Sequence, residues 1–557
     1  MASQRPEFFN FAVNVIDYWA AQPGNLQAMQ WVSQDESCTK TMSFEYFARQ
    51  SHRIAVLFEQ WGLKEGDTMI MILPRVPAWW EIAIGALRSG IVLSPATTLC
   101  TEKDIQYRCV KSAAKVFIGD AVSVAKFLSI QQVCPTVEKV IQVGDGPSNQ
   151  AISLYSSLET ISADAKFQAM QRHWSRPALI YFTSGTSGPP KMVGHNQISY
   201  PLANVNTGKY WYQLAPGRVL WNTAEQGWGK AAWSFFAAWN CGASLFVYDD
   251  RQAFRPQRTI DILHRYPITT LCAAPLVFRH LVSTQTQEHF KQNRPKALVH
   301  CTAAGEALDA EVTRRWQQMT GLEIHEGYGQ TETILLCGNL KGSIIRPGSM
   351  GKPAPGVPLH VITSTGADTA DGEEGDMAVL LSAGKDKSDF FGIFDGYVES
   401  GTTVHREEKT YTTNGEVKTW YLTGDKAYRD EDGYIWFVGR ADDVINTSGY
   451  RIGPFEVEST LNMHPAVAES VIVSSPDDTR GEVVKAFVVL TAEFKDADQN
   501  NLREQLQGFC KKYAAPYKYP RKIEFVTRGF LPRTSSGKIQ RAILKKIEWR
   551  NRVKARL

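Results

Sequence analysis

Short apolar runs alternate with helical patterns along the first three quarters of the chain. The stretches 46–61 and 79–89 carry apolar residues at helical spacing, whereas 68–73 and 115–119 are apolar runs of strand length. Further strand-like runs occur at 139–143, 178–182, 243–248, 269–273 and 297–301. Strands that alternate with helices tend to pair in parallel and to be covered by those helices. The pattern therefore predicts an α/β fold built on parallel and mixed sheets.

The pattern changes after about Gly439. A helix is predicted at 455–463 and β-rich runs follow at 470–474 and 483–490. A second amphipathic helix is marked by its apolar residues Leu502, Leu506, Phe509 and Tyr513. With 557 residues the chain is also too long for a single hydrophobic core. We therefore predict a large α/β domain at 1–439, a joining segment at 440–442 and a small α+β domain at 443–557.

The composition argues against a nucleic-acid-binding, a membrane-spanning or a disulfide-rich protein. A net charge of only +4 does not argue for a nucleic-acid partner, and a hydrophobic fraction of 43% is enough for sizeable cores. No run reaches the ~18 apolar residues of a membrane helix, and 79–92, broken by Glu81 and Arg88, is predicted to be a buried helix. The nine cysteines are scattered and form no C-x-x-C, so neither a zinc site nor a disulfide framework is indicated. A soluble protein of a reducing compartment is expected.

A loop rich in glycine and hydroxyl residues follows the run 178–182. Its residues are Thr183, Ser184, Gly185, Thr186, Ser187, Gly188, Pro189, Pro190 and Lys191. Glycines let backbone N–H groups point at phosphate oxygens, hydroxyls add donors and the lysine adds a positive charge. The spacing is not that of the P-loop G-x-x-x-x-G-K-[ST]. A flexible surface loop is the alternative on composition alone, but the preceding strand and the closing lysine favour a phosphate site.

Four more motifs follow in order along the chain. They are EGYGQTE at 326–332, YLTGD at 421–425, GRADD at 439–443 and PRTSSGK at 532–538. With the phosphate loop, this set resembles the adenylate-forming superfamily, which holds acyl-CoA synthetases, luciferases and the adenylation domains of peptide synthetases. The stretches 73–80, 445–454 and 515–524 are most similar to the medium-chain acyl-CoA synthetases. The resemblance covers nearly the whole chain and implies a large adenylate-forming domain with a small, mobile C-terminal domain.

The resemblance implies an ATP site. It assigns the β- and γ-phosphates to the loop from Thr183 to Lys191, the α-phosphate to Thr331 and Mg²⁺ to Glu332. A single carboxylate suits Mg²⁺, which is bound largely through phosphate oxygens and water. The other ATP residues that it implies are Glu326, Gly327, Tyr328 beside adenine, Gly329, Gln330, Asp425 at the ribose hydroxyls, and Arg440 at ribose or phosphate.

The small domain is expected to complete the site. Lys538 would bridge ATP and the carboxylate during adenylation, so Lys191, Thr331, Glu332 and Lys538 are the predicted catalytic residues. For the second half-reaction the resemblance implies rotation about a hinge at Asp442. It then places coenzyme A at Ser448, Gly449, Tyr450, Arg451, Arg480 and Arg521. Surface salt bridges are the alternative for the last two arginines.

The acyl pocket is the least defined part of the predicted site. The resemblance implies that Trp228, Gly305 and Gly329 line it. Aromatic residues are dense in 221–239, but such residues belong to a core more often than to a ligand pocket. Lys230 would either pair with a polar group of the substrate or face solvent.

These expectations describe an ATP- and Mg²⁺-dependent acid–thiol ligase. It would activate a medium-chain fatty or aryl carboxylic acid as an acyl-AMP and transfer the acyl group to coenzyme A, releasing AMP and pyrophosphate. Three alternatives stay open: an adenylating enzyme that loads a carrier protein in trans, a luciferase-like oxidoreductase, and an inactive acyl or nucleotide binder. The sequence does not name the acid.

The last three residues, Ala555, Arg556 and Leu557, resemble the S-K-L type of peroxisomal address. Basic residues just before them are expected to keep the tail exposed, and the N-terminal residues show no transit-peptide pattern. A basic tail that ends this way by chance is the alternative. We therefore expect a peroxisomal protein that an import receptor recognises, with the cytoplasm as the alternative location.

Overall fold

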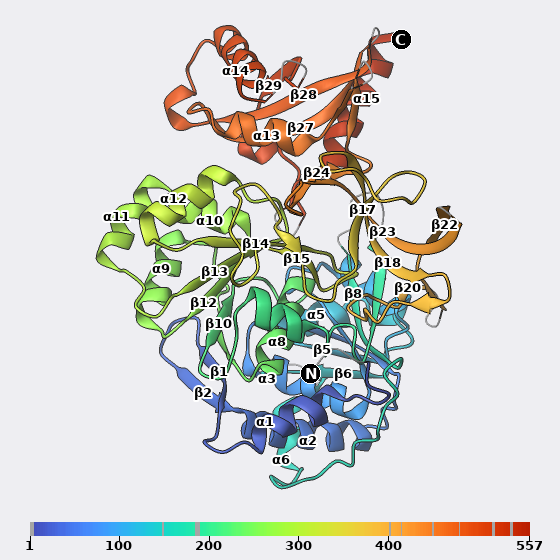
Figure 1. Ribbon diagram of the computed structural model, residues 1–557. Coiled ribbons are helices and arrows are strands. Elements are labelled where there is room, and N and C mark those ends of the chain that lie inside the picture. The colour runs from blue at the N-terminus through green and yellow to red at the C-terminus, as the bar shows by residue number, and fades with distance from the viewer. Residues whose placement is uncertain are drawn as a thin grey trace.

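The computed structural model describes residues 5–146, 150–183, 190–399, 403–413, 415–447, 450–477, 480–514, 518–534 and 538–556. Three sheets and their helices form a large body, and the end of the chain forms a smaller body above it, coloured orange to red in Figure 1. The predicted fold class, a large α/β domain followed by a small α+β domain, is confirmed.

The first nine-stranded sheet carries the EGYGQTE motif. In spatial order its strands are β16 (Lys352–Pro353), β15 (Leu335–Gly338), β14 (Ile324–Gly329), β13 (His300–Ala304), β12 (Thr270–Ala273), β10 (Val219–Asn222), β11 (Ser244–Tyr248), β1 (Gln27–Val32) and β2 (Thr39–Ser43). The strands from β14 to β1 pair in parallel, and β15 turns back antiparallel to β14. The motif therefore lies where the parallel part of the sheet ends.

The second nine-stranded sheet carries the phosphate loop. Its strands are β21 (Thr403–His405), β20 (Gly396–Glu399), β9 (Met192–Asn196), β8 (Pro177–Phe182), β4 (Val92–Pro95), β3 (Thr68–Ile72), β5 (Val116–Gly119), β6 (Lys139–Gln142) and β7 (Ile152–Ser153). The strands from β8 to β7 are parallel, whereas β8 and β9 form an antiparallel pair. The phosphate loop connects that pair.

Helices cover both sheets. Those of six or more residues are α2 (Phe44–Gln60), α3 (Pro77–Ser89), α4 (Glu102–Lys111), α5 (Ala121–Leu128), α6 (Leu154–Glu159), α8 (Gly229–Asn240), α9 (Pro256–Arg265), α10 (Pro275–Leu281), α11 (Thr284–Gln292) and α12 (Ala310–Thr320). Helix α3 is buried along most of its length, as predicted. Both of its charged side chains have partners, because Tyr46 Oη donates a hydrogen bond to Glu81 at 2.7 Å and Arg88 forms an ion pair with Asp17 at 2.6 Å. One core cluster unites α3 and α8 with strands of both sheets.

A third, antiparallel sheet carries the YLTGD and GRADD motifs. Its strands are β17 (Leu359–Ile362), β18 (Glu374–Ala383), β23 (Glu416–Arg429) and β22 (Lys409–Thr413), with β19 (Asp386–Lys387) on β18 and β24 (Ile435–Arg440) on β23. The sequence Thr413-Asn414-Gly415-Glu416 suggests a two-residue hairpin, and Thr413 does pair with Glu416. Asn414 lies outside the described residues. Gly415 has a φ of 80°, a left-handed conformation that glycine adopts without steric cost.

The small body has its own cores. Its elements are β25 (Ile445–Thr447), β26 (Tyr450–Ile452), α13 (Pro454–Asn462), β27 (Val467–Asp477), β28 (Gly481–Leu490), α14 (Gln499–Tyr513), β29 (Lys522–Phe525) and α15 (Arg541–Arg556). The face that includes Val457, Leu461 and Leu506 forms one cluster, and Val471, Phe487 and Leu544 belong to another. Burial on both faces of this sheet explains why the β-rich runs predicted there are mostly apolar.

One predicted strand begins later than expected. The run 297–301 was predicted from its apolar residues, but the chain enters the sheet only at His300. Leu298 is buried, whereas Val299 is 53% exposed, although the Val299 N–H already donates to the Thr269 carbonyl at 3.0 Å. Within the described ranges, no helix combines the length and the apolar character needed to cross a bilayer.

Candidate active site

The two ends of the phosphate loop are held together by the β8–β9 pair. The backbone N–H of Thr183 donates to the Lys191 carbonyl at 3.0 Å, and the Lys191 N–H donates to Thr183 Oγ1 at 3.2 Å. Helix α4 supports the returning end, because Tyr107 Oη donates to the Pro190 carbonyl at 2.9 Å. Five predicted phosphate contacts, Ser184, Gly185, Thr186, Ser187 and Gly188, lie outside the described residues.

Close packing explains two glycines of the EGYGQTE motif. A Cβ on Gly327 would lie about 2.5 Å from Trp211, and a Cβ on Gly329 would lie 2.4 Å from the Ile334 carbonyl and 2.5 Å from Trp233. These distances are too short for any side chain, so the backbone of β14 approaches its neighbours as closely as glycine allows. Gly329, a predicted pocket residue, therefore faces the indole of Trp233.

The carbonyl of Thr331 is held by two aromatic side chains. It accepts a hydrogen bond from Tyr200 Oη at 2.6 Å and one from His195 Nε2 at 2.8 Å, and the two donor rings stack at 3.6 Å. Burial lowers the pKa of His195 to about 3, so the imidazole is neutral and carries its proton on Nε2. The sequence offered no sign of this contact, because more than 130 residues separate the partners.

Asp425 lies at the centre of a polar network. Its Oδ2 accepts from Tyr328 Oη at 2.5 Å and from Gln330 Nε2 at 2.8 Å, and its Oδ1 lies 3.4 Å from Arg440 Nη1. The side chain is buried, and burial raises the pKa of Asp425, while Arg440 and the other donors favour the ionised form. Four predicted ATP residues are thus brought together from three motifs.

The side chains of Glu332 and Lys191 both contact Tyr397, a residue that was not predicted from the sequence. Tyr397 Oη donates to Glu332 Oε1 at 2.9 Å, and Lys191 Nζ lies 4.4 Å from the centre of the Tyr397 ring. Burial raises the pKa of Glu332, and the charges of Arg440 and Lys191 oppose that rise. Within the described ranges, no three His, Cys, Asp or Glu side chains gather into a metal cage.

Lys538 reaches the large body from the small one. Its loop is closed by the Thr534 N–H, which donates to the Lys538 carbonyl at 2.8 Å, and residues 535–537 between them lie outside the described residues. Burial lowers the pKa of Lys538, while the carboxylates of Glu306, Asp425 and Glu332 favour its charged form. The Lys538 side chain itself is exposed to solvent.

Glu326 and Glu306 hold the loop that borders this site. The predicted ATP residue Glu326 is buried, and its Oε1 accepts the Leu308 N–H at 3.1 Å. Glu306 accepts from the Leu276 N–H at 3.0 Å and from Arg279 at 2.7 Å. Glu306 was not predicted, although it directly follows Gly305, a predicted pocket residue.

Lys230 bonds to the backbone of β13. Its Nζ donates to the Ala304 carbonyl at 3.0 Å, at the end of β13. Burial lowers the pKa of Lys230, as does the positive charge of Lys538, whereas Cys272 and Glu306 act in the opposite direction. Lys230 is half-buried, and its pairing with a polar group of the substrate stays a prediction.

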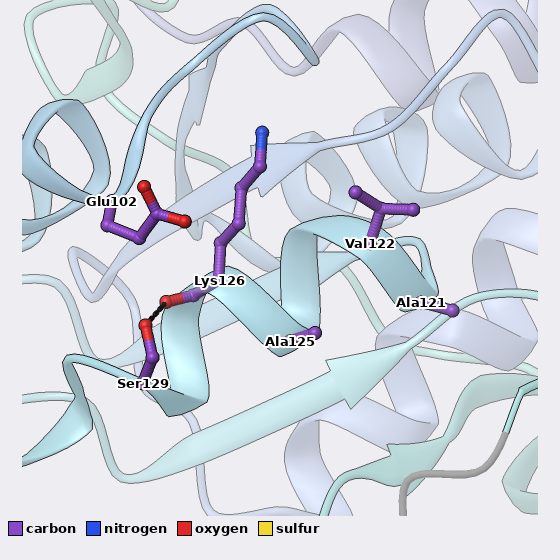
Figure 2. A pocket seen from close by; sticks show the side chains of 6 residues that line it. All are labelled: Glu102, Ala121, Val122, Ala125, Lys126 and Ser129. Carbon is purple, nitrogen blue, oxygen red and sulfur yellow. Dashed lines mark hydrogen bonds between the residues drawn. The ribbon is translucent and has the colours of Figure 1, made fainter.

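The predicted aromatic stretch 221–239 belongs mostly to the core. Phe235, Phe236 and Trp239 are buried and contact one another, whereas Trp228 precedes α8 and is half-buried. A surface hollow of about 490 Å³ lies elsewhere, between α4 and α5 (Figure 2). It is lined by Glu102, Ala121, Val122, Ala125, Lys126 and Ser129. None of these is a predicted site residue, so the hollow is separate from the site described above.

Most predicted coenzyme A contacts are not placed in detail. Ser448 and Gly449 lie outside the described residues, as do the side chains of Tyr450 and Arg451 on β26. Arg521 lies beside the Tyr519 ring at 5.0 Å, and its N–H donates to the Val484 carbonyl at 2.9 Å. The Arg480 N–H donates to Asp477 Oδ1 at 2.9 Å. Both arginines border the small sheet and are exposed.

Comparison with known proteins decides the family. The model of the AMP-binding enzyme family matches residues 16–382, and that of the AMP-binding enzyme C-terminal domain matches 456–538. The chain belongs to the AMP-binding enzyme family. Acyl-coenzyme A synthetase ACSM3, mitochondrial, of Homo sapiens is 42% identical over 98% of this chain and 90% of its own length. Acyl-coenzyme A synthetase ACSM4, mitochondrial, of Rattus norvegicus is 43% identical over 98% and 91%.

Solved structures agree with this family. This AMP-binding enzyme resembles the anthranilate CoA ligase AuaEII in complex with anthranoyl-AMP, with a TM-score of 0.85 and 26% identity over 100% of both chains. It also resembles the Brucella canis acyl-CoA synthetase, with a TM-score of 0.71 and 29% identity over 99% of this chain and 96% of the other. The predicted superfamily, its likeness to the medium-chain acyl-CoA synthetases and the predicted AMP-forming ligase class are confirmed.

The predicted peroxisomal location of this AMP-binding enzyme is wrong. The relatives that align with 98% of the chain are named mitochondrial, which points to mitochondria. The cytoplasmic alternative and the peroxisomal import receptor are left without support. A match of three residues is short enough to arise by chance. The last helix, α15, runs through Arg556.

Proposed function

We propose that this AMP-binding enzyme is an ATP- and Mg²⁺-dependent ligase that converts a medium-chain fatty or aryl carboxylic acid to its acyl-CoA through an acyl-AMP. One observation carries the proposal: Lys191, Glu332, Asp425 and Lys538 come from four separate segments and meet around one site. The named activities of the relatives, acyl-CoA synthesis and anthranilate activation, support the acid and the acceptor.

Adenylation requires a carboxylate to approach the α-phosphate of ATP, and both are negatively charged. Positioning and charge neutralisation therefore do most of the catalytic work. Asp425, held by Tyr328 and Gln330, receives the ribose hydroxyls as a fixed two-oxygen acceptor. Lys191 and the rest of the loop from Thr183 bind the β- and γ-phosphates, Thr331 contacts the α-phosphate, and Lys538 bridges ATP and the carboxylate.

The residues present fit a magnesium ion. Glu332 offers a single carboxylate, and Mg²⁺ in nucleotide sites needs only one or two carboxylates beside phosphate oxygens and water. When bound, Mg²⁺ neutralises phosphate charge and favours departure of pyrophosphate. Burial raises the pKa of Glu332 because a buried carboxylate is less stable than a neutral carboxyl group. A nearby positive charge, from Lys191 or from a bound cation, stabilises the carboxylate.

The domain division belongs to the same proposal. Residues 1–439 hold the nucleotide, 440–442 act as the hinge and 443–557 move. The carboxylates of Glu306, Asp425 and Glu332 act electrostatically on Lys538, and this proximity supports the adenylation arrangement. Rotation about Asp442 then brings coenzyme A, held by Ser448, Gly449, Tyr450, Arg451, Arg480 and Arg521, to the adenylate. Arginines suit its phosphates because they bind oxyanions in a bidentate manner.

Product analysis tests the proposal. The protein is incubated with ATP, Mg²⁺ and a panel of medium-chain and aryl carboxylates, with and without coenzyme A. Acyl-CoA, AMP and pyrophosphate are expected with coenzyme A, and acyl-AMP without it. ADP and phosphate as the nucleotide products would overturn the mechanism. Acyl-AMP that never transfers to coenzyme A would instead indicate a carrier protein as the acceptor.

A further inference from the structure

Tyr397 joins two parts of the site that are far apart in the sequence. Its strand β20 pairs with β9, directly after the phosphate loop, with Tyr397 opposite Val193. The residues just before β20 bond to the EGYGQTE segment, because the Phe394 N–H donates to the Glu332 carbonyl at 2.7 Å and the Ile334 N–H donates to the Gly392 carbonyl at 3.0 Å. Tyr397 is thus fixed by backbone pairing to both motifs.

The side chain of Tyr397 contacts the functional group of each motif. Its hydroxyl donates to Glu332 Oε1 at 2.9 Å, and the Lys191 ammonium lies 4.4 Å from the ring centre. The first contact is a hydrogen bond to a carboxylate, which is stronger than a neutral one. The second has the distance of a cation–π interaction. One residue therefore orients a negative group with its hydroxyl and a positive group with its ring.

The arrangement keeps the two charges near each other but unpaired. Lys191 influences the ionisation of Glu332 through space. Yet the ion pairs found in the described part of the chain do not include one between them. A direct lysine–carboxylate pair would satisfy both groups and reduce their attraction for Mg²⁺ and for phosphate. Tyr397 instead contacts both groups.

We propose that Tyr397 is a positioning residue for ATP and Mg²⁺: its hydroxyl orients the Glu332 carboxylate and its ring holds the Lys191 ammonium, so that both charges stay available to the nucleotide. The proposal rests on the function proposed above, which assigns Lys191 to phosphate and Glu332 to the metal. A purely structural tyrosine would affect stability without distinguishing the two ligands.

Two variants separate the two contacts. Tyr397→Phe removes the hydroxyl and keeps the ring, whereas Tyr397→Leu removes both. The measurement is calorimetric titration of the protein with ATP, without a carboxylic acid, in the presence of Mg²⁺ and in its absence. Tyr411→Phe is the matched control, because Tyr411 lies on β22 and is not part of the site.

For Tyr397→Phe we expect the gain in ATP affinity that Mg²⁺ provides to fall about three- to tenfold, with metal-free ATP binding unchanged. For Tyr397→Leu we expect metal-free binding to weaken as well, because Lys191 loses its ring. Wild-type Mg²⁺ dependence in Tyr397→Phe would overturn the proposal. If Tyr397→Leu does not fold, as its melting temperature would show, Tyr397→Phe still decides the question.

Two further variants distinguish failure of this inference from failure of the proposed function. Glu332→Gln should lose the Mg²⁺-dependent gain, and Lys191→Met should weaken ATP binding in both conditions. If these two variants respond as expected and Tyr397→Phe does not, only the role of Tyr397 is wrong. If both bind Mg²⁺ and ATP like the wild type, the assignment of the site itself is wrong.

Discussion

Asp425 and Arg440 lie opposite each other in the pairing of β23 with β24, and Arg440 Nη1 is 3.4 Å from Asp425 Oδ1. The same guanidinium reaches the proposed hinge, because Arg440 Nε is 3.7 Å from Asp442 Oδ1. From the small body, Lys545 Nζ donates to the Asp442 carbonyl at 3.3 Å. One arginine therefore contacts both the proposed ribose acceptor and the residue about which the small domain is proposed to rotate.

Asp425→Asn should raise the KM for ATP by about 10- to 100-fold. The amide keeps the shape of the carboxylate but loses its charge, and its NH₂ group opposes one of the donors from Tyr328 and Gln330. Hydrogen bonds to charged groups contribute about 1.5–3 kcal/mol, and each 1.4 kcal/mol is roughly a factor of ten. Steady-state kinetics at saturating carboxylic acid measure the change.

The control is Asp376→Asn, which removes a carboxylate paired with Lys426 in the same sheet. It should leave the KM for ATP near the wild-type value. An equal rise in both variants would contradict the ribose role of Asp425.

Lys538→Ala should slow acyl-AMP formation by ~10²–10³, the usual effect of removing one preorganised group at a developing charge. Transfer from a supplied acyl-AMP to coenzyme A should stay nearly intact, because Lys538 faces the large body in the adenylation arrangement. Tyr450→Ala and Arg451→Ala should show the opposite pattern, with slower transfer to coenzyme A and nearly normal acyl-AMP formation.

Single-turnover kinetics of each half-reaction measure these effects. Lys546→Ala is the control, because Lys546 is an exposed lysine of α15. Equal losses in both steps for Lys538→Ala would mean that the lysine is structural.

Asp442→Pro should spare adenylation more than thioester formation. Proline restricts φ to about −65° and also limits the residue before it, so rotation at the hinge is hindered, whereas Lys538 is already within electrostatic range of Glu332 and Asp425. The two half-reactions are again measured separately. Asp442→Ala keeps the rotation free and should support both. Loss of both steps in Asp442→Ala would show that the side chain, and not the freedom of the backbone, is required.

Glu326→Gln should stabilise the protein at pH 8 and have little effect at pH 4.5. Burial raises the pKa of Glu326 to about 8 from its ordinary value of 4.5, so the folded carboxyl binds a proton more tightly than the unfolded one. The protonated Glu326 carboxyl therefore contributes fully to the free energy of unfolding below pH 4.5, and this contribution is lost as the pH rises through 8. Glutamine copies the neutral form and still accepts the Leu308 N–H.

Each pKa unit corresponds to about 1.4 kcal/mol, so the gain at pH 8 should exceed about 1 kcal/mol. Chemical denaturation at several pH values measures it. Glu323→Gln, at an exposed neighbouring position, should change nothing. A gain in Glu326→Gln that is independent of pH would argue against a buried neutral carboxyl.

Lys230→Met should raise the KM for the carboxylic acid by about tenfold and leave the KM for ATP unchanged. The ammonium is desolvated and donates to the Ala304 carbonyl, and its remaining donors suit an anionic substrate. Methionine keeps the apolar stem and removes the charge. The two KM values are compared with those of Lys209→Met, an exposed lysine outside the site. A change in melting temperature without a change in either KM would mean that Lys230 only supports β13.

Local patterns in the sequence predicted the elements and motifs well. The period of the apolar residues identified α2, α3, β3 and β8 to within a few residues, because burial of one face imposes the same period on any helix or strand. Asn-Gly predicted the hairpin between β22 and β23, since such turns depend on two adjacent residues. Failures occurred where a short pattern was the only signal, as with the start of β13, which begins at His300, and with the C-terminal tripeptide.

By itself, then, the sequence determined that the chain forms an α/β domain followed by a small α+β domain and carries five ordered motifs of an AMP-binding enzyme. Only the tertiary structure decided which side chains hold those motifs in place. The Thr331 carbonyl is held by Tyr200 and His195, and Glu332 and Lys191 are held by Tyr397. These partners lie 65 or more residues from the groups they hold. Hydrogen bonds and ring contacts of this kind form only after the sheets have brought distant segments within about 3–5 Å, and no periodicity or spacing along the chain records them.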